Sequence, residues 1–277
     1  MLGSACFKYF SLRKEFVTYS TSRKELTGFL KCENASSLSS ILSRYEIDYV
    51  INCIGVIKPN INEQNQESLI EAIRINSLFP HEIAQVASIS GARVIQIATD
   101  CVFSGSKGAY VESDFHDYKD FYGKTKSLGE VNNSIFLNLR TSIIGREIYN
   151  FNSLLEWFLR QPPGKLKGFT NHFWNGITTY HFAVICAGII VNDFNLSGTR
   201  HLVPNNFVTK AELLYLFQRI YEKFDVEIIS TLADNSVDRT LSTNSVETNK
   251  LLWQMGGYDS PPTIETMLLE SAKFYSS

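Results

Sequence analysis

Long uncharged apolar runs are absent from this sequence. The longest, FAVICAGIIV at 182–191, is far shorter than the roughly 20 residues that cross a bilayer. The first residues also lack the basic segment and the apolar stretch of a secretory leader, so we expect no signal peptide. We therefore predict a cytoplasmic location and no membrane partner.

Metal-binding and disulfide patterns are missing as well. The five cysteines form no C-x-x-C pair and have no histidine cluster near them; they are Cys6, Cys32, Cys53, Cys101 and Cys186. We therefore predict free thiols and no metal site. Charge is sparse, at 19% of residues with a net charge of −2, and contains no polybasic tract. This balance gives no basic field for nucleic acid.

Strands and helices alternate in the first half of the chain. Short apolar runs predict buried strands, and leucines and isoleucines at helical spacing predict helices between them. The alternation indicates an α/β fold with a doubly wound, mostly parallel sheet of Rossmann type. We expect strands at 16–19, 48–56, 92–105 and 134–145, and helices at 36–45, 68–91 (broken at Pro80 and stopped by Gly91) and 124–133.

The rhythm changes after Gly145. A short amphipathic helix, a Pro-Pro turn and an aromatic loop follow, then a helix at 211–224, a strand at 226–230 and a final helix in TIETMLLESAKFY. We divide the 277 residues into a Rossmann-type domain at 1–145 and, at 146–277, mainly a smaller substrate lobe with some segments returning to the main domain.

The first residues, MLGSACFKYFS, have a helical apolar face where a doubly wound sheet should begin with a strand and a glycine-rich turn. We hypothesise that such a strand and part of its turn precede Met1, as a misplaced start codon would explain. The alternative is a helix-first protein with an unusual sheet.

Tyr122 and Lys126 stand four residues apart in DFYGKTKSLGE, so on a helix they share a face. A nearby ammonium favours the phenolate, and we therefore expect Lys126 to lower the pKa of Tyr122. Thr99 follows the strand VIQIA at its carboxyl end, where its hydroxyl and the phenol can grip one substrate oxygen. A surface tyrosine with a solvated lysine, and a threonine and an Asp100 that only cap a turn, remain the structural alternatives.

Six segments in order, VINCIG, IRINSLFP, IATDCVFSG, YVESD, DFYGKTKSLGE and LNLRTSIIG, resemble the extended short-chain dehydrogenase/reductases. More narrowly, the chain is similar to the dTDP-4-dehydrorhamnose reductase family. That family transfers a hydride from a nicotinamide to the 4-keto group of a nucleotide-linked deoxysugar. The resemblance therefore implies an NAD(P)-dependent oxidoreductase that acts on a nucleotide sugar, in a surface polysaccharide pathway.

The resemblance also assigns residues. Thr99, Tyr122 and Lys126 match the family's catalytic threonine, tyrosine and lysine. The positions implied at the cofactor, besides Tyr122 and Lys126, are Met1, Leu2, Gly3, Cys53, Ile54, Gly55 and Asn76.

The second predicted strand is followed by TSRK at 21–24, with no acid before Glu25. An acidic residue there would bind the ribose hydroxyls of NAD, whereas an arginine accommodates the 2′-phosphate of NADP. We expect NADP(H) in preference to NAD(H), with Ser22 and Arg23 at the phosphate.

Two features differ from the rhamnose enzymes. Cys101 stands where the family has a tyrosine, and GFTNHFWNGITTYHFA replaces an acidic, proline-containing segment, so we do not name the sugar. Candidate substrate contacts are Asp100, Cys101, Asn152, Trp174 (which is as compatible with the core) and Arg239.

Alternative functions remain open. A non-catalytic relative of this fold is the regulatory β subunit of methionine adenosyltransferase, and other relatives are nucleotide-sugar epimerases or dehydratases. A homodimer is one assembly open to such a chain.

Overall fold

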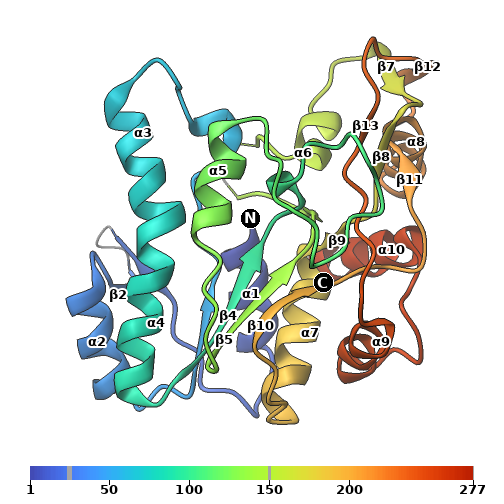
Figure 1. The fold of residues 1–277 in the computed structure, drawn as a ribbon. Helices are drawn as coiled ribbons and strands as arrows, with labels where there is room; N and C mark the ends of the chain where they lie inside the picture. The colour runs from blue at the N-terminus through green and yellow to red at the C-terminus, as the bar shows by residue number, and fades with distance from the viewer. Residues whose placement is uncertain (24–26, 149–150, 277) are drawn as a thin grey trace.

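The computed structural model describes residues 1–23, 27–148 and 151–276. Its centre is a four-stranded, all-parallel sheet in the order β10-β5-β4-β3 (Figure 1). The register aligns Ile51, Ile95 and Leu137 across three strands. This confirms the predicted α/β class. The strands are β3 (Tyr49–Asn52), β4 (Arg93–Ala98), β5 (Phe136–Arg140) and β10 (Gly198–His201).

Helices cover both faces of this sheet, because successive side chains of a strand point to opposite faces. Val94 and Phe136 pack in one apolar cluster with α2 (Ala35–Arg44) and α4 (Phe79–Ser90). Ile95 and Leu137 pack in the other with α1 (Leu2–Ser11) and α7 (Thr179–Val191). The strands are thus buried on both sides, as the apolar runs predicted.

The predicted helix at 68–91 is three elements in sequence. The chain runs through α3 (Gln66–Ile73), a π-helical turn η2 (Arg74–Leu78) and α4, whose first turn holds Pro80. Proline lacks an N–H and is best tolerated in the first turn of a helix. Gly91 ends α4 in the left-handed region, with φ of 80°, so the predicted stop is confirmed.

The predicted strand at 16–19 is wrong. These residues form no strand, and the first extended pairing lies further on, where β1 (Thr21–Ser22) pairs in parallel with β2 (Leu30–Lys31) as a separate small sheet. Within the described part of the chain, β3 has no strand on its other side. The predicted upstream strand lies outside the sequence and stays a prediction.

Two more elements have boundaries that differ from the predicted ones. The predicted helix at 124–133 is α5 (Phe121–Leu128), which begins earlier because Asp120 accepts a hydrogen bond from the Gly123 N–H as its N-cap. The predicted strand at 134–145 is β5 and a separate β6 (Ile143–Ile144), since the chain leaves the main sheet at Thr141 and pairs with β9 (Ile177–Thr178).

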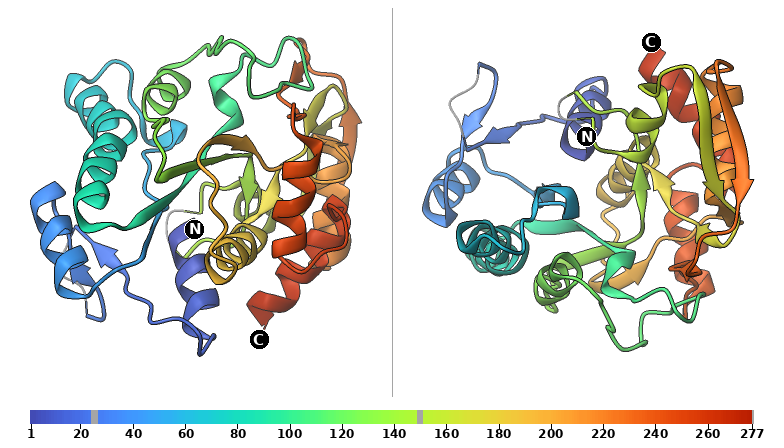
Figure 2. Two further views of the ribbon diagram at one scale, coloured as in Figure 1. Left: turned by 60° about the horizontal axis from the view of Figure 1, so that its bottom comes forward. Right: turned by 90° about the horizontal axis from the view of Figure 1, so that it is seen from above.

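The second half contributes to both parts of the molecule. β10 is a strand of the main sheet and α7 packs on one face of that sheet, while most of the remaining elements stand beside it (Figure 2). One large apolar cluster contains Leu139 of β5, Phe217 of α8 and Leu268 of α10, so the two parts share a core. The lobe consists of α6 (Leu154–Leu159), β7 (Gly164–Phe169), β8 (His172–Trp174), β11 (Val208–Thr209), α8 (Lys210–Ile220), β12 (Val226–Thr231), β13 (Val237–Asp238), α9 (Val246–Met255) and α10 (Ile264–Ser276).

The most apolar stretch, 182–191, lies inside α7, a buried helix packed on α1. Among the described residues no helix has the length and hydrophobicity needed to cross a membrane. Two short 3-10 turns, η1 (Lys58–Asn60) and η3 (Asp100–Val102), follow the carboxyl ends of β3 and β4.

Candidate active site

Thr99 is the first residue after β4, at the carboxyl end of the sheet. It caps η3, since its Oγ1 accepts a hydrogen bond from the Cys101 N–H at 3.2 Å. The same hydroxyl donates to Oδ1 of Asp100, also at 3.2 Å. The predicted position at the carboxyl end of the strand is correct, while these two bonds are those of the alternative in which the threonine caps a turn.

Tyr122 and Lys126 lie on one face of α5, where Lys126 is buried and Tyr122 is half-buried. The Thr99 hydroxyl lies near enough to the Tyr122 phenol to act on it and lower its pKa. The ammonium of Lys126, which is 6% exposed, donates to the carbonyl oxygen of Ile97 at 3.1 Å. The structure thus brings the three predicted side chains to one place, and a solvated tyrosine–lysine pair does not describe them.

Gly123 allows this approach. A Cβ at its position would lie 2.3 Å from the carbonyl oxygen of Cys101 and 2.7 Å from Cβ of Tyr118. Real Cβ atoms do not come so close to backbone, so only glycine lets α5 press against η3. The glycine between Tyr122 and Lys126 therefore has a structural cause, which is the contact that joins the phenol to Thr99.

The pKa of Tyr122 differs from the sequence-based expectation. Burial raises the pKa of the phenol well above its ordinary value, and the neighbouring Cys101 thiol adds to this effect. The expected lowering by Lys126 is wrong for the protein alone, because burial dominates and Lys126 is not among the main groups that act on the phenol. Burial in turn lowers the pKa of Lys126 to about 8, while Glu130 opposes the shift.

Asp100 and Cys101 lie directly beside this pair. Burial raises the pKa of the Asp100 carboxyl, which Arg239 and Lys210 counteract. Burial and the adjacent Asp100 raise the pKa of the Cys101 thiol to about 12, so the thiol stays protonated. Cys101 is thus a small neutral lining group next to Tyr122 and not a nucleophile.

Gly3 lies in the first turn of α1, facing the turn after β3. A Cβ on Gly3 would stand 3.6 Å from Cβ of Cys53, and no side chain caps the helix after Met1. Ile54, the next residue of the turn, is 40% exposed. Leu2 is 5% exposed and belongs to the apolar core, so its side chain does not face a ligand; only its backbone remains available.

Asn76 holds the same turn from behind. Its Oδ1 accepts from the Val56 N–H at 2.8 Å, and its Nδ2 donates to the Val56 carbonyl at 2.9 Å and to Oγ1 of Thr125 at 3.1 Å. The amide is 1% exposed. Its groups are therefore committed to the protein, and Asn76 positions the turn of Gly55 rather than reaching a cofactor.

Ser22 and Arg23 stand at the end of β1. The Arg23 guanidinium is exposed and lies 3.3 Å from the Glu71 carboxylate. An exposed ion pair of this kind is weak, so it leaves Arg23 able to turn to another anion. Lys24, the second cation of TSRK, lies outside the described residues.

Of the other predicted substrate contacts, Arg239 reaches the site and Trp174 does not present a free ring. Nε of Arg239 donates to the Phe103 carbonyl at 3.0 Å, just beyond η3. Trp174 is 5% exposed, belongs to the core and donates its indole N–H to Ser142. This burial favours the core alternative over a substrate contact for Trp174. Asn152 is exposed, just before α6.

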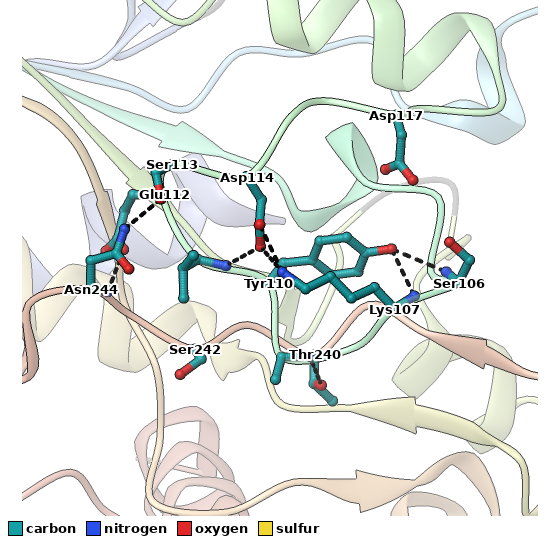
Figure 3. Close-up of polar contacts among 12 residues, drawn as sticks. Ser106, Lys107, Tyr110, Glu112, Ser113, Asp114, Asp117, Thr240, Ser242 and Asn244 are labelled. Carbon is teal, nitrogen blue, oxygen red and sulfur yellow. Dashed lines mark hydrogen bonds and ion pairs between the residues drawn. The ribbon is translucent and has the colours of Figure 1, made fainter.

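Polar contacts of Tyr110 and Lys107 hold the loop after η3 (Figure 3). The phenol oxygen of Tyr110 accepts hydrogen bonds from three successive backbone N–H groups, those of 105, 106 and 107, at 3.1–3.2 Å. The Lys107 ammonium pairs with the Asp114 carboxylate at 2.6 Å. Backbone bonds between Tyr110 and residues 240 and 242 then fix the segment that follows Arg239.

Sequence reasoning missed Lys210, at the start of α8. The lysine is distant in sequence and matches no motif, so only the placement of β11 against β8 reveals it. Among the described residues no group of three or more metal-binding side chains occurs. A surface cavity of about 350 Å³ is lined by other residues, including Lys107, Asn205, Phe207 and Thr240, and does not include Tyr122.

The parallel sheet with helices on both faces, together with a threonine, a tyrosine and a lysine at its carboxyl end, defines a short-chain dehydrogenase/reductase fold. A family model described as RmlD substrate binding domain matches residues 1–162. The chain belongs to this family, which confirms the resemblance seen in the sequence.

Curated relatives include methionine adenosyltransferase 2 subunit beta of Xenopus tropicalis, 28% identical over 77% of this chain and 67% of that protein. The spore coat polysaccharide biosynthesis protein SpsK of Bacillus subtilis (strain 168) is 34% identical over 34% of this chain and 32% of its own length. Among solved structures, dTDP-4-dehydrorhamnose reductase from Bacillus anthracis in complex with NADP superimposes with a TM-score of 0.69 at 19% identity, over 88% of this chain and 86% of that one. At this identity the likeness shows the shared fold.

Proposed function

We propose that this protein reduces the 4-keto group of a nucleotide-diphosphate deoxysugar with NADPH, in the synthesis of a surface polysaccharide. The observation that carries the proposal is the proximity of the Thr99 hydroxyl to the Tyr122 phenol, with Lys126 on the same helical face of α5 as Tyr122. A donor, a second hydrogen-bonding group and a cation around one point suit a carbonyl that becomes an alkoxide.

The residues present fit a nicotinamide dinucleotide. The α1 N-terminus carries no side-chain cap, Gly3 leaves its first turn open toward Cys53, and Ile54 is exposed beside it. Such backbone N–H groups suit a pyrophosphate. Bound NADPH would supply the hydride to the keto carbon.

Tyr122 donates the proton. Because burial raises its pKa, the phenol is fully protonated at neutral pH and ready to protonate the developing alkoxide oxygen. The Thr99 hydroxyl donates to Asp100 in the protein alone and would turn to donate to the same oxygen when the substrate is bound. Lys126, still mostly charged at neutral pH with a pKa of about 8, favours the phenolate left behind and binds the ribose hydroxyls.

The preference for NADPH rests on Ser22, the last residue of β1, on Arg23, which follows it, and on the absence of an acid at both positions. The NADP complex of the Bacillus anthracis reductase supports the choice for this fold. NAD(H) remains the alternative cofactor.

Consumption of reduced cofactor tests the proposal. The purified chain should oxidise NADPH faster than NADH when a 4-keto nucleotide sugar is added, across a panel that varies the nucleotide and the sugar. Product analysis should show a new hydroxyl at the former keto carbon. If no member of the panel causes cofactor oxidation, the reductase proposal fails.

A second candidate has one observation in its favour. The relatives that match over 77% of this chain are β subunits of methionine adenosyltransferase 2. A subunit role predicts a stable complex with a methionine adenosyltransferase catalytic subunit in size-exclusion chromatography, and no turnover of any keto sugar. The retained Tyr122, Lys126 and Thr99 support the reductase instead.

A further inference from the structure

Arg140, the last residue of β5, lies at the centre of a buried polar cluster and is 1% exposed. Its Nε and Nη2 donate to the two carboxylate oxygens of Glu130, just after α5. The same Nη2 donates to Nε2 of His116 at 2.8 Å, and Nη1 donates to Nε2 of His201, also at 2.8 Å. The cluster therefore joins two strands of the main sheet, the end of α5 and the loop after η3.

These contacts fix the protonation state of both imidazoles. A guanidinium has only donors, so each Nε2 that faces it must offer a lone pair and carry no proton. Each ring then has its proton on Nδ1. For His201 this N–H donates to the Ser242 carbonyl at 2.6 Å, a partner that can only accept. For His116 it donates to Oγ of Ser127, on α5, at 2.7 Å. The contacts on both sides of each ring thus agree on a neutral imidazole.

The charged groups around the two imidazoles come from three parts of the fold. The cation is Arg140 of β5. Among the described residues the carboxylates that act on the rings lie in the loop after η3 and just after α5, and they are Glu112, Asp114, Asp117 and Glu130. These four already accept hydrogen bonds from other groups, in the same order from the Asn244 N–H, the Lys107 ammonium, the Ser104 hydroxyl and the Arg140 guanidinium.

Protonation of either imidazole would break the cluster. A proton on Nε2 would set two donors face to face at 2.8 Å and bring two positive charges together in the interior. Burial, and then the charge of Arg140, lowers the pKa of His201 to about 4 against the opposing effect of Glu112. The same two causes lower the pKa of His116. In acid the unfolded chain, whose imidazoles titrate near pH 6.5, therefore binds protons before the folded protein does.

We propose that Arg140, His116 and His201 form an acid-sensitive switch that holds the C-terminal end of α5 to the main sheet only while both imidazoles are neutral. The held groups are Ser127, through His116, and Glu130, through Arg140. Lys126 is the neighbour of Ser127 in α5, so the switch acts beside the candidate active site. The inference goes beyond the proposed function and does not depend on it.

Urea unfolding at pH 7 and at pH 5 tests the switch. His201→Gln and His116→Gln each keep a neutral acceptor for Arg140 and do not titrate in this range. The pKa of His201 is about 4 in the folded protein and near 6.5 in the unfolded chain. Between these two pH values the unfolding constant of the wild type should therefore rise about twentyfold more than that of His201→Gln. His172→Gln, on β8 and outside the cluster, is the control and should follow the wild type.

Two further measurements locate the effect. After correction for the intrinsic rate, the hydrogen-exchange protection of amides 127–130 should fall about tenfold or more from pH 7 to pH 5 in the wild type. It should persist in the variant that combines His116→Gln with His201→Gln. NMR spectra of the wild type with nitrogen-labelled imidazoles need no variant to fold. They should show both rings as neutral Nδ1–H tautomers at pH 7.

The proposal is overturned if the wild type and both glutamine variants lose stability in parallel as the pH falls, because a purely structural role lowers stability by the same factor at every pH. It is equally overturned if either ring is charged at pH 7 or carries its proton on Nε2. Undiminished protection of amides 127–130 in the wild type at pH 5 would also overturn it, since the end of α5 would then remain held.

Discussion

At the scale of single residues, burial decides how Tyr122 and Lys126 behave. Lys126 is buried and Tyr122 half-buried. Burial disfavours the charged form of each, so the phenol becomes a weaker acid and the ammonium a stronger one. The sequence indicated the pairing but not its depth. The packing of α5 determines both pKa values: it keeps the phenol protonated and lowers the pKa of the lysine to about 8.

The pH dependence of kcat/KM should report Lys126. Its pKa in the free protein is about 8, so kcat/KM for NADPH-dependent reduction should be constant below that pH and fall above it as the ammonium is lost. The measurement is a pH–rate profile, and Lys126→Met should remove the limb and lower the rate. A limb that persists in Lys126→Met would contradict the assignment.

The same lysine has a defined effect on stability. The pKa is lowered in the folded state from 10.5 to about 8, so between these values the unfolded chain binds more protons. The contribution of Lys126 to the free energy of unfolding therefore rises as the pH increases through this window. Urea unfolding of wild type and Lys126→Met at both ends of the window should show the difference.

Arg23 should govern the choice between NADPH and NADH. Its guanidinium is exposed and held only by a surface ion pair with Glu71, so it can bind a 2′-phosphate. We expect Arg23→Ala to raise the KM for NADPH by about tenfold or more, as for the loss of a charge-assisted contact, and to leave the KM for NADH unchanged. Arg44→Ala, on α2, is the control. An unchanged KM for NADPH would remove Arg23 from the phosphate site.

At the scale of elements, the contact between α5 and η3 assembles the site. Asp120 fixes where the helix begins, and Gly123 lets it approach the Cys101 carbonyl. Lys126 then reaches Ile97 of β4. The three side chains meet because a helix start and a strand end are packed together without an intervening side chain.

Gly123→Ala should break this contact. The added methyl would collide with backbone, so α5 must shift outward, at a cost of about 1–3 kcal/mol in the free energy of unfolding. Reductase activity should fall more than the affinity for NADPH, because Tyr122 leaves Thr99. Urea unfolding and initial rates measure the two effects. The control is Lys124→Ala, on the exposed side of α5. If the two variants have the same unfolding midpoint and the same initial rate, α5 does not pack closely against η3 at Gly123.

Periodicity predicted the elements whose apolar faces are unambiguous. It located α2, α4 and α8 to within a few residues, and Gly91 ended α4 as expected. It also located the start of β4, but the strand ends at Ala98 and not at residue 105. It failed where pairing decides: residues 16–19 look like a strand but have no neighbour to hydrogen-bond, and Ile143 belongs to β6 because its partner is Ile177. A strand is defined by its partner, which local sequence does not contain.

At the scale of the whole molecule, the second half of the chain closes the first. β10 extends the main sheet beside β5, and α7 packs on α1, while β11, β8 and β13 carry Lys210 and Arg239 to the turn after β4. These contacts join residues that lie far apart in the sequence, which local patterns do not reveal. Arg239 was therefore predicted only through the resemblance, and Lys210 was not predicted. One apolar core contains residues of both the main sheet and the lobe, so packing between the two parts fixes the position of the lobe.

The central claim is that Tyr122 gives a proton to a carbonyl oxygen held by Thr99, and one comparison tests it most directly. Tyr122→Phe and the control Tyr215→Phe, a half-exposed tyrosine of α8, are each assayed for NADPH binding and for NADPH oxidation with the 4-keto nucleotide sugar that the wild type reduces. We predict that Tyr122→Phe binds NADPH as the wild type does but loses turnover by about 10²-fold or more, while Tyr215→Phe keeps it. Turnover by Tyr122→Phe at the wild-type rate would contradict the claim.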